Sequence, residues 1–262
     1  MNLDLSGKTA LVGGSTQGIG KEVAMELAKM GATLVLAARN EEKLKACLAE
    51  LDSSLGQEHT YICADFSDPQ TLEKAVKNYL SNGALVNILV NNTGGPKGGP
   101  AIDAPVEEYL AAFNQHLICN QILANLLVDG MKKSKYGRIV NIISTSVKAP
   151  LKGLGVSNTV RGAVANWSKT LAGELGAFGI TVNNVLPGAT STSRLDEIVT
   201  KKASDSGKSK DEIMKGMAAA VPLGRIAVPQ EIAAAVAFLA SPAASYISGV
   251  NLPVDGGRTP SL

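Results

Sequence analysis

The amino-acid sequence predicts an α/β fold with a doubly wound parallel sheet of about seven strands and helices on both faces. Short apolar runs, typical of buried parallel strands, alternate along the chain with longer stretches whose apolar residues recur at helical spacing. Repeats of strand, helix and strand pair their strands in parallel through right-handed crossovers. The composition agrees, because 45% hydrophobic and 18% charged residues suit a globular domain with a sizeable core.

The strands are predicted from short apolar runs bounded by polar or glycine residues. The runs ILVNN and RIVNII are almost continuously apolar, as strands buried on both faces should be. In chain order, the candidate strands are Thr9–Val12, Thr33–Ala37, Thr60–Cys63, Val86–Asn91, Arg138–Ile143, Thr181–Leu186 and Gly249–Val254.

The helices between these strands are predicted from apolar residues spaced three or four apart. One such series is Ile19, Val23, Leu27 and Met30. Another is Leu44, Leu48, Leu51 and Leu55. Asp68 followed by Pro69 is typical of an N-cap with proline at the first helical position, and Gly31 is typical of a helix stop.

The chain is predicted to form one domain over residues 1–262, because no proline- or serine-rich linker divides it and no internal repeat is apparent. Residues 189–221 have no clear period and include the polar run TKKASDSGKSKDE. A mobile polar segment of this length in a compact domain is usually a substrate lid. The alternative is a solvated surface excursion.

The charge and the cysteines restrict the functional class. A net charge of +2 is too small for a general nucleic-acid or membrane-surface binder, and no apolar run approaches the roughly 20 residues that span a bilayer. The start MNLDLSGKT lacks the basic and apolar parts of a signal peptide. Cys47, Cys63 and Cys119 are widely spaced, which favours reduced thiols of a cytoplasmic protein over disulfides or a metal site.

A glycine-rich turn follows the first strand and leads into a helix. Its sequence, GGSTQGIGKEV, has glycines at positions 13, 14, 18 and 20. Glycine permits a tight turn and a close approach of the backbone, so that a phosphate can lie against the positive end of the helix dipole. The position between a strand and a helix is the context in which such a turn predicts a nucleotide site.

Further motifs accompany this turn: NNTG at 91–94, ADFSD around Asp65, LPGATST from Leu186, and a C-terminal third that begins PLGRIAVPQEI and ends VDGG. Together they resemble the short-chain dehydrogenase/reductase family, whose glycine motif is Thr-Gly-x-x-x-Gly-x-Gly. The likeness covers essentially the whole chain. It implies a Rossmann-type fold, a nicotinamide dinucleotide cofactor and an oxidoreductase activity.

The resemblance implies a cofactor site position by position. The pyrophosphate would lie against Gly14, Gly18, Ile19 and Gly20, the adenine near Asp65, the adenosine ribose near Asn91 and Gly94, and the nicotinamide end near Pro187, Gly188 and Thr192. Two positions depart from the family pattern, since Gly13 replaces a threonine and Thr93 replaces an alanine. The loss of the threonine hydroxyl at position 13 should loosen the turn and leave the phosphate-binding position in place.

The end of the second strand predicts the choice of cofactor. A carboxylate there would bind the ribose 2′-hydroxyl of NAD, whereas an arginine can pair with the 2′-phosphate of NADP. The sequence LAARNEEKL has Arg39 at this point and therefore favours NADP(H). The alternative is an ordinary surface arginine at a helix entrance.

The resemblance also implies a catalytic tetrad of asparagine, serine, tyrosine and lysine, and three of these four positions are altered. Ser144 stands at the serine position, His116 at the asparagine, Ser157 at the tyrosine and Arg161 at the lysine. Ser157 and Arg161 are four residues apart and share a helix face. An alkyl hydroxyl is far less acidic than a phenol, and arginine, which can still bind the cofactor ribose, cannot shuttle a proton.

Two other groups are candidates for the missing acid. His116 has a side chain that ordinarily titrates near neutral pH, and Lys148 follows Ser144 in the loop that should overhang the nicotinamide, with Lys152 just beyond. The alternatives are a structural histidine and solvent-facing lysines. Ser157 has an alternative as a plain helix N-cap.

Two functions therefore remain open. One is an NADP(H)-dependent oxidoreductase for a ketone or alcohol, on an atypical branch similar to β-ketoacyl-acyl-carrier-protein reductases but without the usual tetrad. The other is a catalytically inactive sensor or scaffold that binds NADP(H). We expect a small-molecule or acyl-carrier-linked carbonyl substrate, no nucleic-acid or membrane partner, and a homotetramer or homodimer formed through helices predicted at 105–134 and 155–178 and the C-terminal strand region. The lysines at 132, 133 and 135 could attract an acidic carrier protein, or they form a solvated surface.

Overall fold

A parallel sheet forms the centre of the molecule, and its strands run in the order β3-β2-β1-β4-β5-β6-β7. The computed structural model describes residues 1–261. The strands are β1 Thr9–Gly13, β2 Thr33–Ala38, β3 Thr60–Cys63, β4 Ile88–Asn91, β5 Gly137–Ile142, β6 Ile180–Pro187 and β7 Asn251–Val254. The predicted doubly wound sheet is confirmed, and the predicted strand ends are correct to within two residues.

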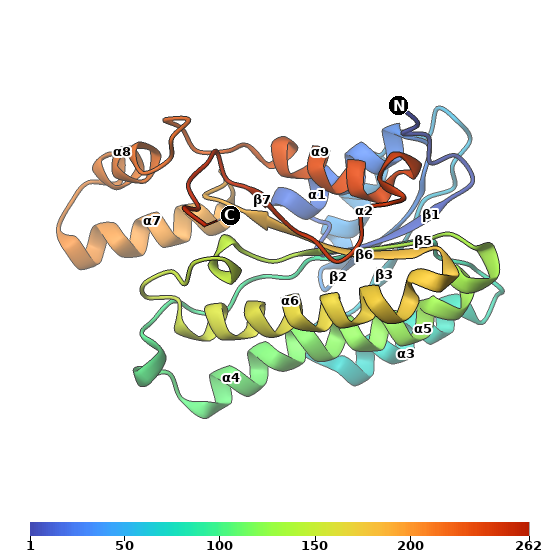
Figure 1. Cartoon of the computed structure of the whole chain (residues 1–262), viewed down its shortest axis with the longest axis horizontal. Coiled ribbons are helices and arrows are strands. Elements are labelled where there is room, and N and C mark those ends of the chain that lie inside the picture. Colours follow the sequence, from blue (N-terminus) through green and yellow to red (C-terminus); the bar gives the residue numbers. More distant parts are fainter. Residues whose placement is uncertain (262) are drawn as a thin grey trace.

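Helices cover both faces of this sheet (Figure 1). On one face lie α1 Gly18–Lys29, α2 Glu41–Ala49 and α9 Pro229–Ala240, and on the other α3 Pro69–Leu80, α5 Cys119–Ser134 and α6 Gly155–Leu175. Each face buries its own core: Val12 and Leu36 belong to the core under α1 and α9, and Leu11 and Leu89 to the core over α3 and α5. The alternation of neighbouring residues between the two cores follows from the pleat of the strands.

Two predicted helix boundaries can be compared with the structure. The N-cap at Asp68 is confirmed, because its carboxylate accepts hydrogen bonds from the backbone N–H groups of Gln70 and Thr71, both at 3.1 Å. The leucine series from Leu44 overestimated α2, which ends at Ala49. Leu55 is 64% exposed and contributes little to the core, so the spacing continued beyond the point at which packing supports a helix.

The segment 189–221 was predicted to be irregular, and this prediction was wrong. Most of it forms two helices, α7 Ser193–Ser206 and α8 Lys210–Ala219, which extend beyond the end of the sheet (Figure 1). Polar residues that obscured the periodicity are caps: the Thr192 side chain accepts from the Leu195 backbone, and Ser209 forms a capping box with Glu212. Local side-chain to backbone bonds thus start both helices.

A row of asparagines crosses four adjacent strands. Asn91, Asn141, Asn184 and Asn251 are direct register partners on β4, β5, β6 and β7. Each side-chain amide donates to the oxygen of the next, at distances of 2.8, 2.9 and 2.8 Å. We call this row the asparagine ladder. Its first member, Asn91, is the last residue of β4, at the carboxyl ends of the strands, where the glycine-rich turn also begins after β1.

In the part of the chain that the structure describes, no helix combines the length and the apolar character needed to cross a bilayer.

Candidate active site

The residues implicated by sequence lie at the carboxyl ends of the strands, where β1, β4, β5 and β6 end side by side. Ligands of open α/β sheets bind at this edge, where the strand order reverses. The sheet reverses its order between β1 and β4. The glycine-rich turn follows β1, so it stands directly beside this point.

The glycine-rich turn has a backbone that only glycine adopts readily. Gly14 and Gly18 have φ angles of +56° and +55°, a conformation that side chains with a Cβ rarely adopt. A Cβ on Gly20 would lie 2.2 Å from the carbonyl oxygen of Gly14 and 2.6 Å from Nδ2 of Asn92. This close packing sets the first turn of α1 against the end of β1 and exposes the helix N-terminus, the environment that a pyrophosphate requires.

The other residues predicted to hold the cofactor surround this turn. Thr192 lies against the turn, since its Cγ2 is 3.2 Å from the point that a Cβ atom would occupy on Gly18. Gly188 packs so closely on Asp255 that a Cβ would lie 2.9 Å from the Asp255 Cα. Gly94 faces open space. Asn91 is buried, and its Oδ1 atom has no hydrogen-bond partner among residues 1–261. The cradle thus fits a dinucleotide, with free space at Gly94 and a polar atom left unpaired.

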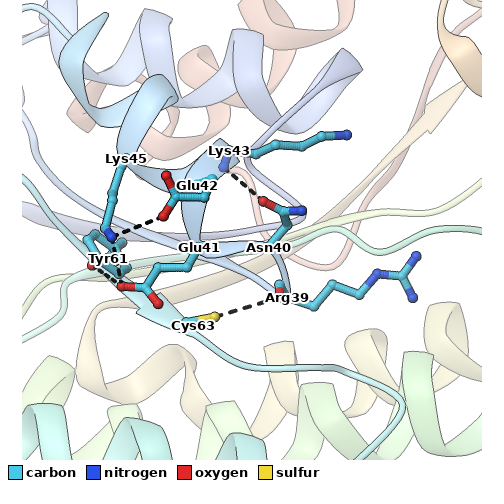
Figure 2. Close-up of polar contacts among 8 residues, drawn as sticks. All are labelled: Arg39, Asn40, Glu41, Glu42, Lys43, Lys45, Tyr61 and Cys63. Atoms are coloured by element: carbon cyan, nitrogen blue, oxygen red, sulfur yellow. Dashed lines mark hydrogen bonds and ion pairs between the residues drawn. The ribbon is translucent and has the colours of Figure 1, made fainter.

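Arg39 lies at the end of β2 with its guanidinium in solvent. Figure 2 shows it extending away from Glu41 and Glu42, whose carboxylates bond Lys45 instead, at 3.2 and 3.1 Å. Its nearest acid is Asp65, at 4.0 Å from Nη1, and the Arg39 side chain is 77% exposed. An exposed pair at this distance is weak, so the guanidinium is available to an anionic ligand beside the adenine position.

The two serines of the altered tetrad have different backbone settings. Ser144 follows β5 and caps the short 3₁₀ turn Thr145–Val147, where its hydroxyl accepts the Ser146 N–H at 3.1 Å. Ser157 lies inside α6, whose N-cap is Leu154. The alternative that Ser157 is a plain N-cap is therefore wrong, because the helix begins three residues earlier than that interpretation required.

Arg161 is buried one helical turn beyond Ser157, with 8% of its surface exposed. Its Nη1 donates to the carbonyl oxygen of Ile142 at 2.9 Å. Its Nη2 lies 4.0 Å from the point that a Cβ atom would occupy if Gly95 carried a side chain. Burial lowers the pKa of Arg161 to about 10, which leaves it charged at neutral pH. A positive charge is therefore fixed between the end of β5 and the loop that follows β4.

His116 lies in a π-helical turn, Asn114–Ile118, between α4 Val106–Phe113 and α5. The ring is 2% exposed, and its Nδ1 is 2.6 Å from Oγ1 of Thr93. Burial and the charge of Arg161 lower the pKa of His116 to about 2, against a small opposing effect of the Gly94 backbone. Burial and the charge of Arg161 both oppose a charged ring, which argues against His116 as an acid–base group that titrates near neutral pH.

This buried imidazole predicts an acid-sensitive fold. The pKa of His116 is lowered on folding, so below its ordinary value of 6.5 the unfolded chain binds a proton that the folded chain does not. The free energy of unfolding should then fall by about 1.4 kcal/mol per pH unit on acidification below 6.5 through this residue alone. Urea denaturation at a series of pH values gives the free energy of unfolding at each pH. For His116→Asn this free energy should change less steeply with pH than for the unmodified protein. Identical slopes would contradict the prediction.

Lys148 ends the 3₁₀ turn after Ser144 and is partly exposed, and Lys152 is exposed. The structure also brings α7 onto the loop after β4, through residues that sequence reasoning did not select. Arg194 Nη2 donates to the Pro96 carbonyl at 2.7 Å, and Lys201 Nζ to the Gly98 carbonyl at 3.4 Å. A possible signal was the place of Arg194 just after the LPGATST motif.

Comparison with known proteins agrees with this geometry. A family model described as enoyl-(acyl carrier protein) reductase matches residues 14–259. A 3-oxoacyl-[acyl-carrier-protein] reductase of Haemophilus influenzae is 33% identical, over 97% of this chain and 98% of its own. The crystal structure of L-sorbose reductase from Gluconobacter frateurii, complexed with NADPH and L-sorbose, is 30% identical with a TM-score of 0.93 and covers 100% of both chains.

A further solved structure, described as a short chain dehydrogenase/reductase family protein, is 33% identical with a TM-score of 0.81 and covers 97% of this chain and 98% of its own. These likenesses extend over almost the whole length of the chain. They agree with the motifs found in the sequence at the glycine-rich turn and before α7, and with the doubly wound order of the strands. The chain belongs to the short-chain dehydrogenase/reductase family.

Proposed function

We propose that this protein is an NADP(H)-dependent oxidoreductase that interconverts a ketone and an alcohol through an altered catalytic tetrad. The observation that carries the proposal is that Ser144 and a charged, buried Arg161 lie at the end of β5, at the same edge of the sheet as the tightly packed glycine-rich turn. A protein that only held adenine would have little use for such a charge at the nicotinamide end.

The cofactor assignment is supported by residues on both sides of the site. The turn at Gly14, Gly18 and Gly20 packs too closely to accept side chains, which lets the backbone at the start of α1 approach a pyrophosphate. Arg39 offers its guanidinium to a 2′-phosphate. The related L-sorbose reductase is described in complex with NADPH. When bound, the cofactor supplies or accepts the hydride.

The chain's own residues act on the oxygen of the substrate. Ser144 offers a hydroxyl as hydrogen-bond donor, and Ser157 shares a helix face with Arg161. Arg161 holds a positive charge where negative charge develops on the oxygen during reduction, and it can also bind the cofactor ribose. Neither Ser157 nor Arg161 releases a proton at neutral pH, so Lys148, acting directly or through water, is the remaining candidate donor of this region.

The deciding experiment mixes the protein with NADPH and a panel of β-ketoacyl thioesters, sugars and simple ketones and follows the loss of NADPH absorbance. Turnover with at least one carbonyl supports the proposal. The rival function, an inactive sensor or scaffold, would instead give measurable NADPH binding by fluorescence titration with no consumption across the whole panel, and that result would overturn the proposal.

Cofactor preference gives a separate prediction. Arg39→Asp replaces the exposed guanidinium with a carboxylate that repels a 2′-phosphate and can accept a hydrogen bond from a 2′-hydroxyl. We expect the unmodified protein to bind NADPH more tightly than NADH and the variant to reverse that order, by about tenfold or more. Fluorescence titration with both cofactors measures the change, and Lys45→Asp, whose side chain bonds Glu41 and Glu42, is the matched control. Equal affinities in the unmodified protein would contradict the prediction.

We also propose the substrate class, the lid, the cellular location and the assembly of this protein. We assign the substrate to small or acyl-carrier-linked carbonyl compounds, in line with the names of the relatives. Residues 189–221, which hold α7 and α8, serve as the substrate lid of the single domain. The three free cysteines suit a reducing, cytoplasmic setting. The assembly is a homotetramer, or a homodimer, built through α4, α5, α6 and the C-terminal strand region, and its mass by light scattering tests this.

A further inference from the structure

Thr93 and His116 form a hydrogen-bonded pair at the altered site. Both residues depart from the family pattern, in the motif NNTG and at the asparagine position of the tetrad. They are 23 residues apart in the chain, yet Oγ1 of Thr93 lies 2.6 Å from Nδ1 of His116. Two departures that meet at a short hydrogen bond suggest one shared role.

The second ring nitrogen of His116 has no such partner. Nε2 is buried and makes no hydrogen bond to any of residues 1–261. Buried polar atoms are nearly always paired in native proteins, and an unpaired one commonly marks a functional site. The ring lies close enough to Arg161 on α6 and to the backbone of Gly94 for both to shift its pKa, and these two residues belong to the predicted catalytic and ribose positions.

The hydroxyl of Thr93 determines which nitrogen carries the proton. If it donates to Nδ1, both its own proton and the Nδ1 lone pair are used, and only an Nε2–H group is left open. If Nδ1–H donates to Oγ1 instead, the Thr93 proton is not used in this pair, and the buried Nε2 lone pair has no donor among the described residues. The first arrangement leaves fewer unmet groups and is the less costly.

We propose that Thr93 is a positioning residue: its hydroxyl donates to Nδ1, holds His116 as the neutral Nε2–H tautomer, and makes that Nε2–H a hydrogen-bond donor to the substrate oxygen. The inference rests on the proposed function for its last step only. A neutral imidazole that donates without titrating polarises a carbonyl and stabilises the developing oxyanion. The altered tetrad would thus hold the oxygen with Ser144, Arg161 and His116 and leave proton delivery to another group.

The tautomer can be observed directly, because the chain has only two histidines. His59 is an internal reference of known form: the Leu34 N–H donates to its Nδ1 at 3.0 Å, so Nε2 bears the proton and lies 2.9 Å from the Asp52 carbonyl oxygen. In the NADPH-bound protein with isotope-labelled histidine, nitrogen NMR should show the Nε2–H pattern for both rings. The His116 signals should not titrate between about pH 5 and 8.

Thr93→Val removes the hydroxyl and nearly preserves the shape. We expect the His116 signals to leave the Nε2–H pattern and kcat to fall about tenfold, with little change in the KM for NADPH. Thr93→Ser keeps a hydroxyl and should restore both the NMR pattern and kcat. Thr170→Val is the matched control, because among residues 1–261 the Thr170 hydroxyl bonds only the Asn166 carbonyl of its own helix. It should change neither the NMR pattern nor kcat.

The proposal is overturned if His116 carries its proton on Nδ1 in the unmodified protein, or if Thr93→Val leaves the tautomer and kcat unchanged. A fall in kcat that Thr93→Ser does not restore would also count against it, since that would be a packing effect. Absence of turnover in the unmodified protein would overturn the proposed function and the donor role, while the NMR comparison of the Val and Ser variants would still decide whether Thr93 sets the tautomer.

Discussion

Gly20→Ala is expected to weaken NADPH binding by about 10²-fold and to lower the free energy of unfolding by about 1–3 kcal/mol. The new Cβ would lie 2.2 Å from the Gly14 carbonyl oxygen, so the backbone at Gly14 must move. That backbone is held by Asn92, whose Nδ2 donates to the carbonyl oxygens of Gly13 and Gly14 at 3.1 and 3.4 Å. The movement therefore displaces the backbone that is proposed to bind the pyrophosphate. Fluorescence titration and urea denaturation measure the two effects.

Gly173→Ala is the matched control for this substitution. Gly173 lies in α6, and a Cβ there would have nothing within 4 Å. Alanine should stabilise the helix by roughly 0.5–1 kcal/mol without altering NADPH affinity. If Gly20→Ala binds NADPH as tightly as the unmodified protein, the turn is not the phosphate seat and the cofactor assignment fails with it.

Arg161→Met should reduce kcat by about 10²–10³-fold, the usual loss when a donor to a developing oxyanion is removed. Methionine fills part of the buried space but carries no charge and no N–H group. The loss should appear in kcat and kcat/KM alike, since the interaction is strongest in the transition state. Because the pKa of Arg161 is about 10, activity of the unmodified protein should not decline through this residue until the pH rises toward that value.

Lys169→Met removes another positive charge from α6, at an exposed position two turns beyond Arg161. This control should leave kcat unchanged and so separates a local effect of the guanidinium from a general effect of charge. Should Arg161→Met retain full kcat, the charge does not act on the reacting oxygen, and Ser144 and the proposed His116 donor would have to account for the whole stabilisation.

The fold was predictable because its strands carry their signal locally. Runs such as Arg138–Ile143 are apolar enough to be recognised alone, and the seven predicted strands all form. The ends of the helices were harder to predict from the sequence. The leucines continue past Ala49, and the caps at Thr192 and Ser209 start helices that their polar surroundings concealed. Periodicity describes which face is apolar, whereas caps and packing decide where a helix begins and ends.

The altered site was predictable in its membership but not in its chemistry. Alignment of motifs named His116 and Arg161 as candidates, yet the ionisation of His116 depends on burial and on the approach of Arg161. Thr93 was visible as a departure from the family pattern, but its bond to His116 joins segments distant in the chain. Side-chain environment is a tertiary property, and local spacing does not contain it.

The asparagine ladder makes the orientation of Asn91 a collective property of four strands. Each internal amide gives its N–H to one neighbour and its oxygen to the other, so neither Asn141 nor Asn184 can rotate without breaking at least two bonds. Asn141 is further fixed by Ser168, whose hydroxyl oxygen accepts from its Nδ2 at 3.3 Å. Polarity therefore runs in one sense from β4 to β7. A substitution on the outer strand β7 can thus disorder the Asn91 side chain, beside the proposed nucleotide position, without contacting that side chain.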